Sequence, residues 1–167
     1  MKGNTINVLF VCLGNICRSP MAEAIFHYQA AERGLDKHFE VDSCGTGAYH
    51  LGTEPDHRTL TVLTRHGIST KHRGRQLAEE DFNHYHHLIA MDHQNLSHMR
   101  QHCQNPALWP KLELMRAYDT EQPGADVPDP YYGDMRDFEA VYALLVQSCS
   151  HLLQTLALRY ELPLHNA

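Results

Sequence analysis

Hydrophobic and polar positions near the N-terminus predict a strand, a tight turn and a helix. Residues 6–11 form a short run rich in apolar and β-branched side chains, which is typical of a buried parallel strand. After the turn, apolar side chains recur at helical spacing at Met21, Ile25 and Tyr28. Ser19 is a residue type that caps helices, Pro20 suits the first helical position, and Gly34 offers a C-terminal stop. The turn from strand to helix therefore lies within residues 12–18.

Strand and helix patterns alternate along the rest of the chain. Strands are predicted at residues 39–43, 87–91 and 112–115, and a helix opens at residues 53–55 and stops at Gly67. One face of a long final helix is lined by Phe138, Val141, Leu145, Cys149, Leu152 and Leu156. We therefore expect residues 1–167 to form a single α/β domain of three layers, a four-stranded parallel sheet with helices on both faces. In such a fold the ligand site lies at the carboxyl ends of the strands, where residues 12, 43, 92 and 129 fall.

The turn over residues 12–18 begins with a cysteine and ends with an arginine. Backbone N–H groups in such a turn converge with the helix dipole on one point, which binds an anion. Cys12 lies near a helix N-terminus and a guanidinium, which favour the nucleophilic thiolate. Arg18 presents a planar fork that can grip two oxygens of a phosphate and hold the phosphorus above the sulfur. The strand before the turn and the helix after it favour this catalytic interpretation over an inert cysteine beside a surface arginine.

The residues between the two ends of the turn supply the remaining phosphate-binding groups: Leu13, Gly14, Asn15, Ile16 and Cys17. Gly14 and Asn15 are the types that best tolerate positive φ, which a loop wrapped around a ligand needs. Ser19, directly after the turn, can donate its hydroxyl to the Cys12 sulfur. We therefore predict a phosphate-binding loop after the first strand.

The turn and four other segments resemble the low-molecular-weight protein tyrosine phosphatases, which begin with a strand, C-x5-R-S-P and a helix. The other matching segments are residues 43–50, 72–77, 89–92 and 126–133. Cys44 stands where the family usually has alanine, Tyr49 where tryptophan is common, and His86 and His87 replace an aromatic-acidic pair. The resemblance implies hydrolysis of phosphotyrosine in proteins through a cysteinyl-phosphate intermediate, with no cofactor. The departures bear on substrate preference and leave the reaction unchanged.

Asp129 lies between Pro128 and Pro130, which can hold its carboxyl firmly. Cleavage of phosphotyrosine expels a phenolate whose conjugate acid has a pKa of about 10, so a positioned acid should protonate it. The same carboxylate can then take a proton from the water that hydrolyses the cysteinyl-phosphate. On composition alone Asp129 is a turn residue in a proline-rich loop. The resemblance of this segment to the family's D-P-Y-Y sequence favours the catalytic role.

The resemblance also implies supporting residues from separate segments. Ser43 and His72 join Asn15 and Ser19 in a hydrogen-bond network that holds the loop in its anion-binding shape. Glu23 can keep His72 charged through an ion pair. The substrate cleft is bounded by two groups of side chains: Tyr131 and Tyr132 as an apolar wall, with Tyr49 at the mouth and Leu13 and Ile16 in the narrow part. A deep, narrow cleft admits a phosphotyrosine ring and leaves phosphoserine short of the sulfur.

Cysteine usage indicates a reducing compartment. The chain has five cysteines, an odd number, and no signal-peptide pattern, so we expect a cytoplasmic protein. Cys17 lies five positions after Cys12 in a loop that curls on itself, and we expect the two sulfurs to bridge once Cys12 is oxidised. Cys44, Cys103 and Cys149 are expected to pack in or near the core.

Charge and histidine content limit the partners. A net charge of -6 argues against nucleic acid, which needs a basic face, and no membrane span is predicted. The fourteen histidines raise the question of a metal, but their spacing matches no zinc pattern, so we expect no metal site. A monomer or a weak dimer is expected.

Three alternatives stay open at this stage. Protein arginine phosphatases and thioredoxin-linked arsenate reductases share the fold and loop. In the arginine-specific relatives a threonine matches Ile16, so we expect the bulkier isoleucine to exclude phosphoarginine. Arsenate reduction needs further cysteines that are close in sequence and mobile, whereas Cys103 and Cys149 are far apart. The third alternative, an inactive phosphopeptide-binding module, is favoured only where Cys12, Arg18 or Asp129 is lost, and all three are present.

Overall fold

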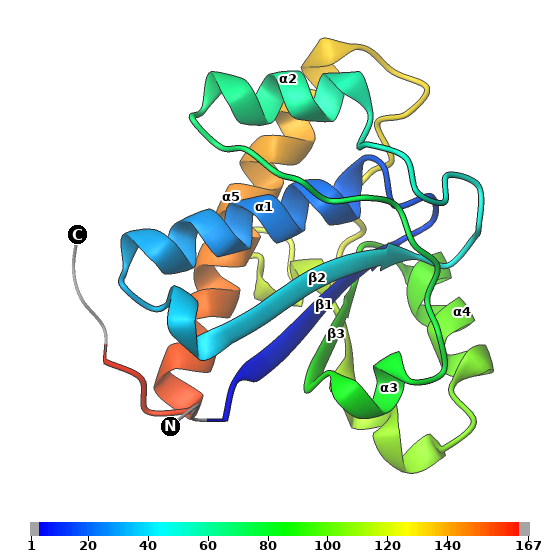
Figure 1. Ribbon diagram of the computed structural model, residues 1–167, viewed down its shortest axis with the longest axis vertical. Coiled ribbons are helices and arrows are strands. Elements are labelled where there is room, and N and C mark those ends of the chain that lie inside the picture. Colours follow the sequence, from blue (N-terminus) through cyan, green and yellow to red (C-terminus); the bar gives the residue numbers. More distant parts are fainter. Residues whose placement is uncertain (1–3, 164–167) are drawn as a thin grey trace.

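A four-stranded parallel sheet forms the centre of the molecule, in a computed structural model that describes residues 4–163 (Figure 1). Its strands are β1 (Ile6–Cys12), β2 (Phe39–Gly45), β3 (His87–Ala90) and β4 (Leu112–Leu114), in the spatial order β2-β1-β3-β4. The helices are α1 (Arg18–Glu32), α2 (His57–Arg65), α3 (Asp81–His84), α4 (His93–His102) and α5 (Met135–Arg159), with short 3-10 helices η1 (Asp36–His38), η2 (Pro106–Lys111) and η3 (Met115–Tyr118). The predicted α/β class, parallel sheet and strand number are confirmed.

Alternation along β1 creates the three layers. Every residue of β1 is buried, and successive side chains point to opposite faces of the sheet. Val8 and Phe10 join a core with α1, α2 and α5, whereas Leu9 and Val11 join a core with α3 and α4. Figure 1 shows α1 and α5 on one side of the sheet and α3 and α4 on the other. Cys12 continues the first set, so its side chain lies on the side where α1 begins.

Helix α5 has the length and apolar composition of a membrane span, which the other described helices lack. Its apolar stripe, however, is buried in the core that α5 shares with α1: Phe138, Val141, Leu145, Cys149, Leu152, Leu153 and Leu156. These include the six positions predicted to line one helix face. The hydrophobicity of α5 is thus explained by core packing.

Element boundaries differ from the sequence prediction at several places. Strand β2 extends to Gly45, two residues further than predicted. The helix predicted to open at residues 53–55 begins at His57, because Asp56 caps it by accepting a hydrogen bond from the Arg58 N–H at 2.8 Å. Helices α3 and α4 were not predicted, because they are short or mostly polar; α4 turns only a few residues, such as Leu96 and Met99, toward the core. The ends of the predicted single domain, residues 1–3 and 164–167, lie outside the described residues.

Candidate active site

The loop between β1 and α1 has the conformation of an anion cradle, with two corrections to the prediction. Asn15 has a φ of 57°, which confirms the expected left-handed residue, but Gly14 does not have positive φ. A Cβ at Gly14 would instead lie 3.3 Å from the His50 ring, so the glycine leaves room for a neighbouring side chain. Ser19 is not the helix cap: α1 begins at Arg18 and has no side-chain cap. The N–H groups at this helix start are therefore not used by a capping side chain.

The end of β2 holds this loop by backbone contacts. The Thr46 N–H donates to the Cys12 carbonyl at 2.8 Å, and the Gly47 N–H donates to the Leu13 carbonyl at 3.0 Å. A Cβ at Gly45 would lie 2.7 Å from the Leu13 oxygen, closer than real Cβ contacts allow. Glycine at position 45 therefore permits β2 and the phosphate-binding loop to approach each other.

The Cys12 sulfur receives two polar contacts. Its Sγ lies 3.0 Å from Ser19 Oγ and accepts from the Asn15 backbone N–H at 3.3 Å. The Asn15 side-chain amide donates to Ser19 Oγ at 2.8 Å and to Ser43 Oγ at 3.0 Å. Ser19 Oγ accepts from Asn15, and its own proton has two acceptors in reach, the Cys12 sulfur at 3.0 Å and the Cys44 carbonyl at 3.4 Å. A thiolate, as the charged and nearer acceptor, is stabilised by this hydroxyl.

His72 completes the network behind the loop. Its Nε2 lies 2.7 Å from Asn15 Oδ1, and its Nδ1 lies 3.1 Å from Glu23 Oε1 and 3.5 Å from Asp42 Oδ1. Burial opposes a charge on this ring, but hydrogen bonds to Asp42 and Glu23 outweigh burial and raise the pKa of His72 to about 9. The hypothesis of a Glu23–His72 ion pair is therefore supported by geometry.

Glu23, Asp42 and His72 also have the residue types of a metal site, with ligand atoms within 4.8 Å of one another. At neutral pH, however, a proton occupies the His72 Nδ1 that faces the two carboxylates. Asp42 is further paired with the Arg75 guanidinium at 2.8 Å. These cations already neutralise the carboxylates, so the cluster is explained as an ion-pair network.

Arg18 is held at the cleft by two hydrogen-bond acceptors and one further ion-pair partner. Its Nη1 donates to Asp92 Oδ2 at 2.7 Å and to the Val127 carbonyl at 3.0 Å, and its Nη2 lies 3.6 Å from Asp129 Oδ2. Burial opposes the charge of Arg18, but the opposite charges of Cys12, Asp92 and Asp129 outweigh it and raise the pKa of the guanidinium. The Arg18 side chain is only 3% exposed, so its orientation is fixed before any anion binds.

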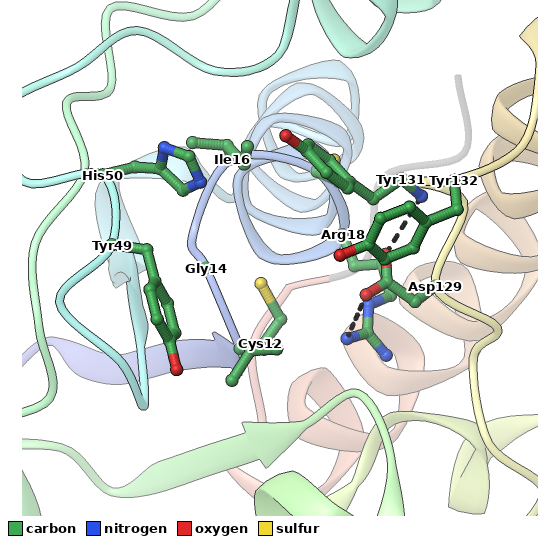
Figure 2. A pocket seen from close by; sticks show the side chains of 11 residues that line it. Cys12, Gly14, Ile16, Arg18, Tyr49, His50, Asp129, Tyr131 and Tyr132 are labelled. Atoms are coloured by element: carbon green, nitrogen blue, oxygen red, sulfur yellow. Dashed lines mark hydrogen bonds and ion pairs between the residues drawn. The ribbon is translucent and has the colours of Figure 1, made fainter.

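A cleft of about 540 Å³ opens above Cys12 (Figure 2). Tyr49 and His50 stand on one side of it, and Asp129, Tyr131 and Tyr132 on the other. It is lined by Cys12, Leu13, Gly14, Ile16, Cys17, Arg18, Tyr49, His50, Asp129, Tyr131 and Tyr132. The structure thus brings the predicted nucleophile, arginine, acid and three tyrosines to one place, while Asn15, Ser19, Ser43 and His72 lie behind the loop as expected.

Sequence reasoning gave no role to His50, and it placed Asp92 at the ligand edge of the sheet without its contact to Arg18. His50 lines the cleft beside Gly14, and Asp92 orients Arg18 while its other oxygen caps α4 by accepting from the Asn95 N–H at 2.7 Å. Asp92 had a detectable signal, since it follows a buried strand at the expected edge of the sheet. His50 lies in a loop without periodicity, and only the fold shows that its ring reaches the cleft.

Asp129 is the carboxylic acid that lines the cleft. Its Oδ1 accepts from the Tyr131 N–H at 3.1 Å, and its side chain is 40% exposed. Asp126, a nearby alternative, is bound instead to the N–H and ring of His93. Asp92 is engaged by Arg18 and the start of α4. The geometry therefore favours Asp129 over either alternative as the group that reaches a bound substrate.

A sulfur nucleophile below an anion-binding loop is the arrangement of a cysteine-dependent phosphatase, and this is the class that the fold and site indicate. A family model described as low molecular weight phosphotyrosine protein phosphatase matches residues 7–161. A Schizosaccharomyces pombe protein of that name is 44% identical over 153 residues, covering 91% of this chain and 97% of the relative. The chain therefore belongs to the low-molecular-weight phosphotyrosine protein phosphatase family and is a phosphoric monoester hydrolase.

Solved structures agree with this assignment, and they include phosphatases of two substrate classes. A crystal structure of a protein tyrosine phosphatase from Entamoeba histolytica matches with a TM-score of 0.89 and 33% identity, covering 93% of this chain and 99% of that chain. A Drosophila arginine phosphatase matches with a TM-score of 0.83 and 36% identity, covering 89% and 96%. Both kinds of neighbour share this fold, so the substrate must be inferred from the cleft.

Proposed function

We propose that this protein hydrolyses phosphotyrosine in proteins through a cysteinyl-phosphate intermediate. The observation that supports this most directly is the meeting of Cys12, Arg18 and Asp129 around one aromatic-walled cleft. Arg18 and the loop N–H groups bind the phosphate oxygens and leave the phosphorus in line with the sulfur. Phosphotyrosine-containing proteins are the substrates that this arrangement suits.

The reaction proceeds in two displacements. The Cys12 thiolate attacks phosphorus, an S–P bond forms, and the P–O bond to the phenol breaks while Asp129 protonates the departing oxygen. Water then attacks the phosphorus, Asp129 takes its proton, and the sulfur leaves as a thiolate with inorganic phosphate as product. The Ser19 hydroxyl, 3.0 Å from the sulfur, stabilises that leaving thiolate.

The walls of the cleft support an aromatic substrate. Tyr49 is 71% exposed and Tyr132 is 92% exposed, so both rings are available to cover a planar substrate ring. Ile16 is 8% exposed and also lines the cleft. A phenyl ring between these apolar surfaces reaches the depth of Cys12, whereas the short side chain of phosphoserine does not.

Arginine phosphatase activity is the second candidate, because of the likeness to the Drosophila arginine phosphatase. Ile16 argues against it, since the isoleucine adds bulk where the arginine-specific relatives carry threonine. Arsenate reduction has less support. Cys103 and Cys149 are buried in cores on opposite faces of the sheet and do not line the cleft.

A comparison of matched substrates tests the substrate class. We expect a higher kcat/KM on a phosphotyrosine peptide than on the same peptide carrying phosphoarginine. Ile16→Thr should bring these two kcat/KM values closer together. The control is Cys12→Ser, which should abolish turnover of both substrates while retaining phosphate binding, because a neutral hydroxyl is a far weaker nucleophile. A preference of the wild type for phosphoarginine would overturn the proposal.

The role of Asp129 is tested by leaving-group dependence. Asp129→Ala must let the phenolate depart with its full charge, so poor leaving groups should suffer most. In burst kinetics the deficit on phosphotyrosine should be about 10²- to 10⁴-fold and should shrink for nitrophenyl phosphate. Equal deficits along a series of aryl phosphates would mark Asp129 as a residue that only shapes its loop.

A further inference from the structure

Arg58, in the first turn of α2, reaches the segment that carries Asp129. Its Nη2 donates to the Tyr131 carbonyl at 2.9 Å and its Nη1 donates to the Gly133 carbonyl at 3.0 Å. Its guanidinium carbon also lies 4.3 Å from the centre of the Phe138 ring on α5. Arg58 does not line the cleft, so it acts at a distance from the substrate.

The same guanidinium is tied to the phosphate-binding loop through Asp56. Arg58 Nε donates to Asp56 Oδ1 and Arg58 Nη2 donates to Asp56 Oδ2, each at 3.0 Å. The backbone N–H of Asp56 donates to the Ile16 carbonyl at 2.8 Å. A continuous set of hydrogen bonds therefore joins the loop that holds the nucleophile to the segment that holds the acid.

Tyr131 connects this set to the Asp129 carboxyl. The Tyr131 N–H donates to Asp129 Oδ1 at 3.1 Å, while the Tyr131 carbonyl accepts from Arg58. Among the described residues, the other hydrogen bond or ion pair that ties residues 128–133 to the rest of the molecule is the Arg18–Asp129 pair. Gly133 N–H bonds to Pro130 within the segment itself. Arg58 is therefore the main anchor on the side of the acid that faces away from Arg18.

We propose that Arg58 is a positioning residue for acid catalysis. It fixes the backbone of Tyr131, whose N–H bonds to Asp129, and so holds the Asp129 carboxyl at the oxygen of the leaving group. This inference rests on the proposed role of Asp129 as the acid. Arginine suits the position because its planar fork serves Asp56 and two carbonyls at once, which the single ammonium of lysine does not. A displacement of about 1 Å is enough to impair catalysis without loss of binding.

Arg58→Met tests the proposal, because methionine can still pack over Phe138 and removes every side-chain donor, while the backbone N–H that bonds to Asp56 remains. We expect kcat/KM on a phosphotyrosine peptide to fall about 10- to 100-fold, a part of what an acid contributes, and activity on nitrophenyl phosphate to fall by less than about threefold. Inhibition by inorganic phosphate should stay within about twofold of wild type, since Arg18 is unchanged and the bond from Asp56 to the loop is a backbone bond that the substitution keeps. Arg58→Lys, which retains the charge on a single ammonium nitrogen, should lie in between and also serves if Arg58→Met does not fold.

Arg65→Met is the matched control. Arg65 lies on the same helix and pairs with Glu139 of α5 at 3.0 Å, without contact to the acid-bearing segment. It should leave the whole leaving-group series unchanged. Thermal unfolding of each variant separates loss of fold from loss of positioning.

A double variant separates this proposal from the role of Asp129. If Arg58 acts through the acid, Asp129→Ala with Arg58→Met should be no more than about twofold slower than Asp129→Ala alone. If the double variant shows the product of the two single-variant rate deficits, the positioning role is overturned and Asp129 remains the acid. The same holds if the Arg58→Met deficit is equal for all leaving groups. If Asp129→Ala itself shows equal deficits, the acid assignment fails, and the role of Arg58 fails with it.

Discussion

Asn15 joins the backbone of the phosphate-binding loop to three other segments of the chain. Its φ of 57° turns the loop, and its side chain bonds to Ser19, Ser43 and His72. Its Oδ1 also accepts from the Arg75 backbone N–H at 3.0 Å. The positive φ follows from residue type and was predictable. Ser43 and His72 were reached only through resemblance, because they lie up to 57 positions away along the chain, and the Arg75 contact was not predicted.

Cys17 gives a prediction at the same scale. Burial, with a smaller contribution from Asp56, raises the pKa of the Cys17 thiol, so we expect peroxide to oxidise Cys12 first. Peroxide would convert the Cys12 sulfur to a sulfenic acid, and the Cys17 sulfur would then displace water to form a disulfide. Intact mass should show the loss of two hydrogens, and a thiol should restore activity.

Cys17→Ser is the comparison for this experiment. Without the second sulfur, Cys12 should proceed to sulfinic and sulfonic acids, and a thiol should restore little activity. Cys149→Ser, far from the cleft in the core beside α1, should behave as wild type. Equal thiol-reversible recovery of wild type and Cys17→Ser would contradict a protective role for Cys17.

At the scale of elements, we expect the close contact between β2 and the phosphate-binding loop to control how well the loop binds an anion. Gly45→Ala would place a methyl group 2.7 Å from the Leu13 carbonyl and 3.2 Å from the Asn15 Cβ. The loop must then shift, so we expect phosphate affinity measured by calorimetry to fall at least about tenfold, since oxyanion donors act over a few tenths of an ångström.

Gly67→Ala is a suitable control for this variant. Gly67 ends α2 with a φ of 73° and has open space around it, so alanine should cost about 1 kcal/mol of stability through backbone strain alone. Its phosphate affinity should equal that of wild type. If both variants bind phosphate equally well, the contact at Gly45 does not shape the loop.

Whether an element could be predicted depended on how clearly the burial of its residues follows a strand or helix pattern. Strand β1 and helix α5 were readable because each is buried along its length or along one face. Helix α2 was placed two to four residues too early, since Pro55 and Asp56 both signal a helix start and the Asp56 cap decides between them. Helix α4 carries histidines on its exposed positions, and its few apolar residues were too sparse for the period to appear.

At the scale of the whole molecule, the parallel sheet brings distant segments to one edge. Residues 12, 43, 92 and 129 were expected there from strand ends alone, and the structure places them together. Arg58 and His50 could not be found in this way, because they lie beyond the end of β2, in α2 and in the loop that joins β2 to α2, where no strand end places a side chain. The position of Arg58 depends on how α2 packs against α5, and that of His50 on its contact with Gly14; both are tertiary contacts without a local signal.

The ion pairs around His72 predict how stability depends on pH. The folded-state pKa of His72 is about 9, above the usual 6.5, so the bound proton stabilises the fold. This contribution is complete below pH 6.5 and is lost as pH rises through about 9. A raised pKa of this size corresponds to at most about 3 kcal/mol. The free energy of unfolding from urea titrations should therefore fall between about pH 7 and 10.

His72→Gln isolates this effect from other groups that titrate in the same range, since buried thiols such as Cys17 also destabilise the fold at high pH. The difference between wild type and His72→Gln should be largest below pH 6.5 and should vanish near pH 10. His27→Gln, at an exposed position of α1, should show no such trend. Phosphate affinity of the wild type should weaken over the same pH range, because the neutral His72 ring no longer donates to both Asn15 and the carboxylates. A wild-type-to-variant difference that stays constant from pH 6 to 10 would show that His72 is not held as a cation by Glu23 and Asp42.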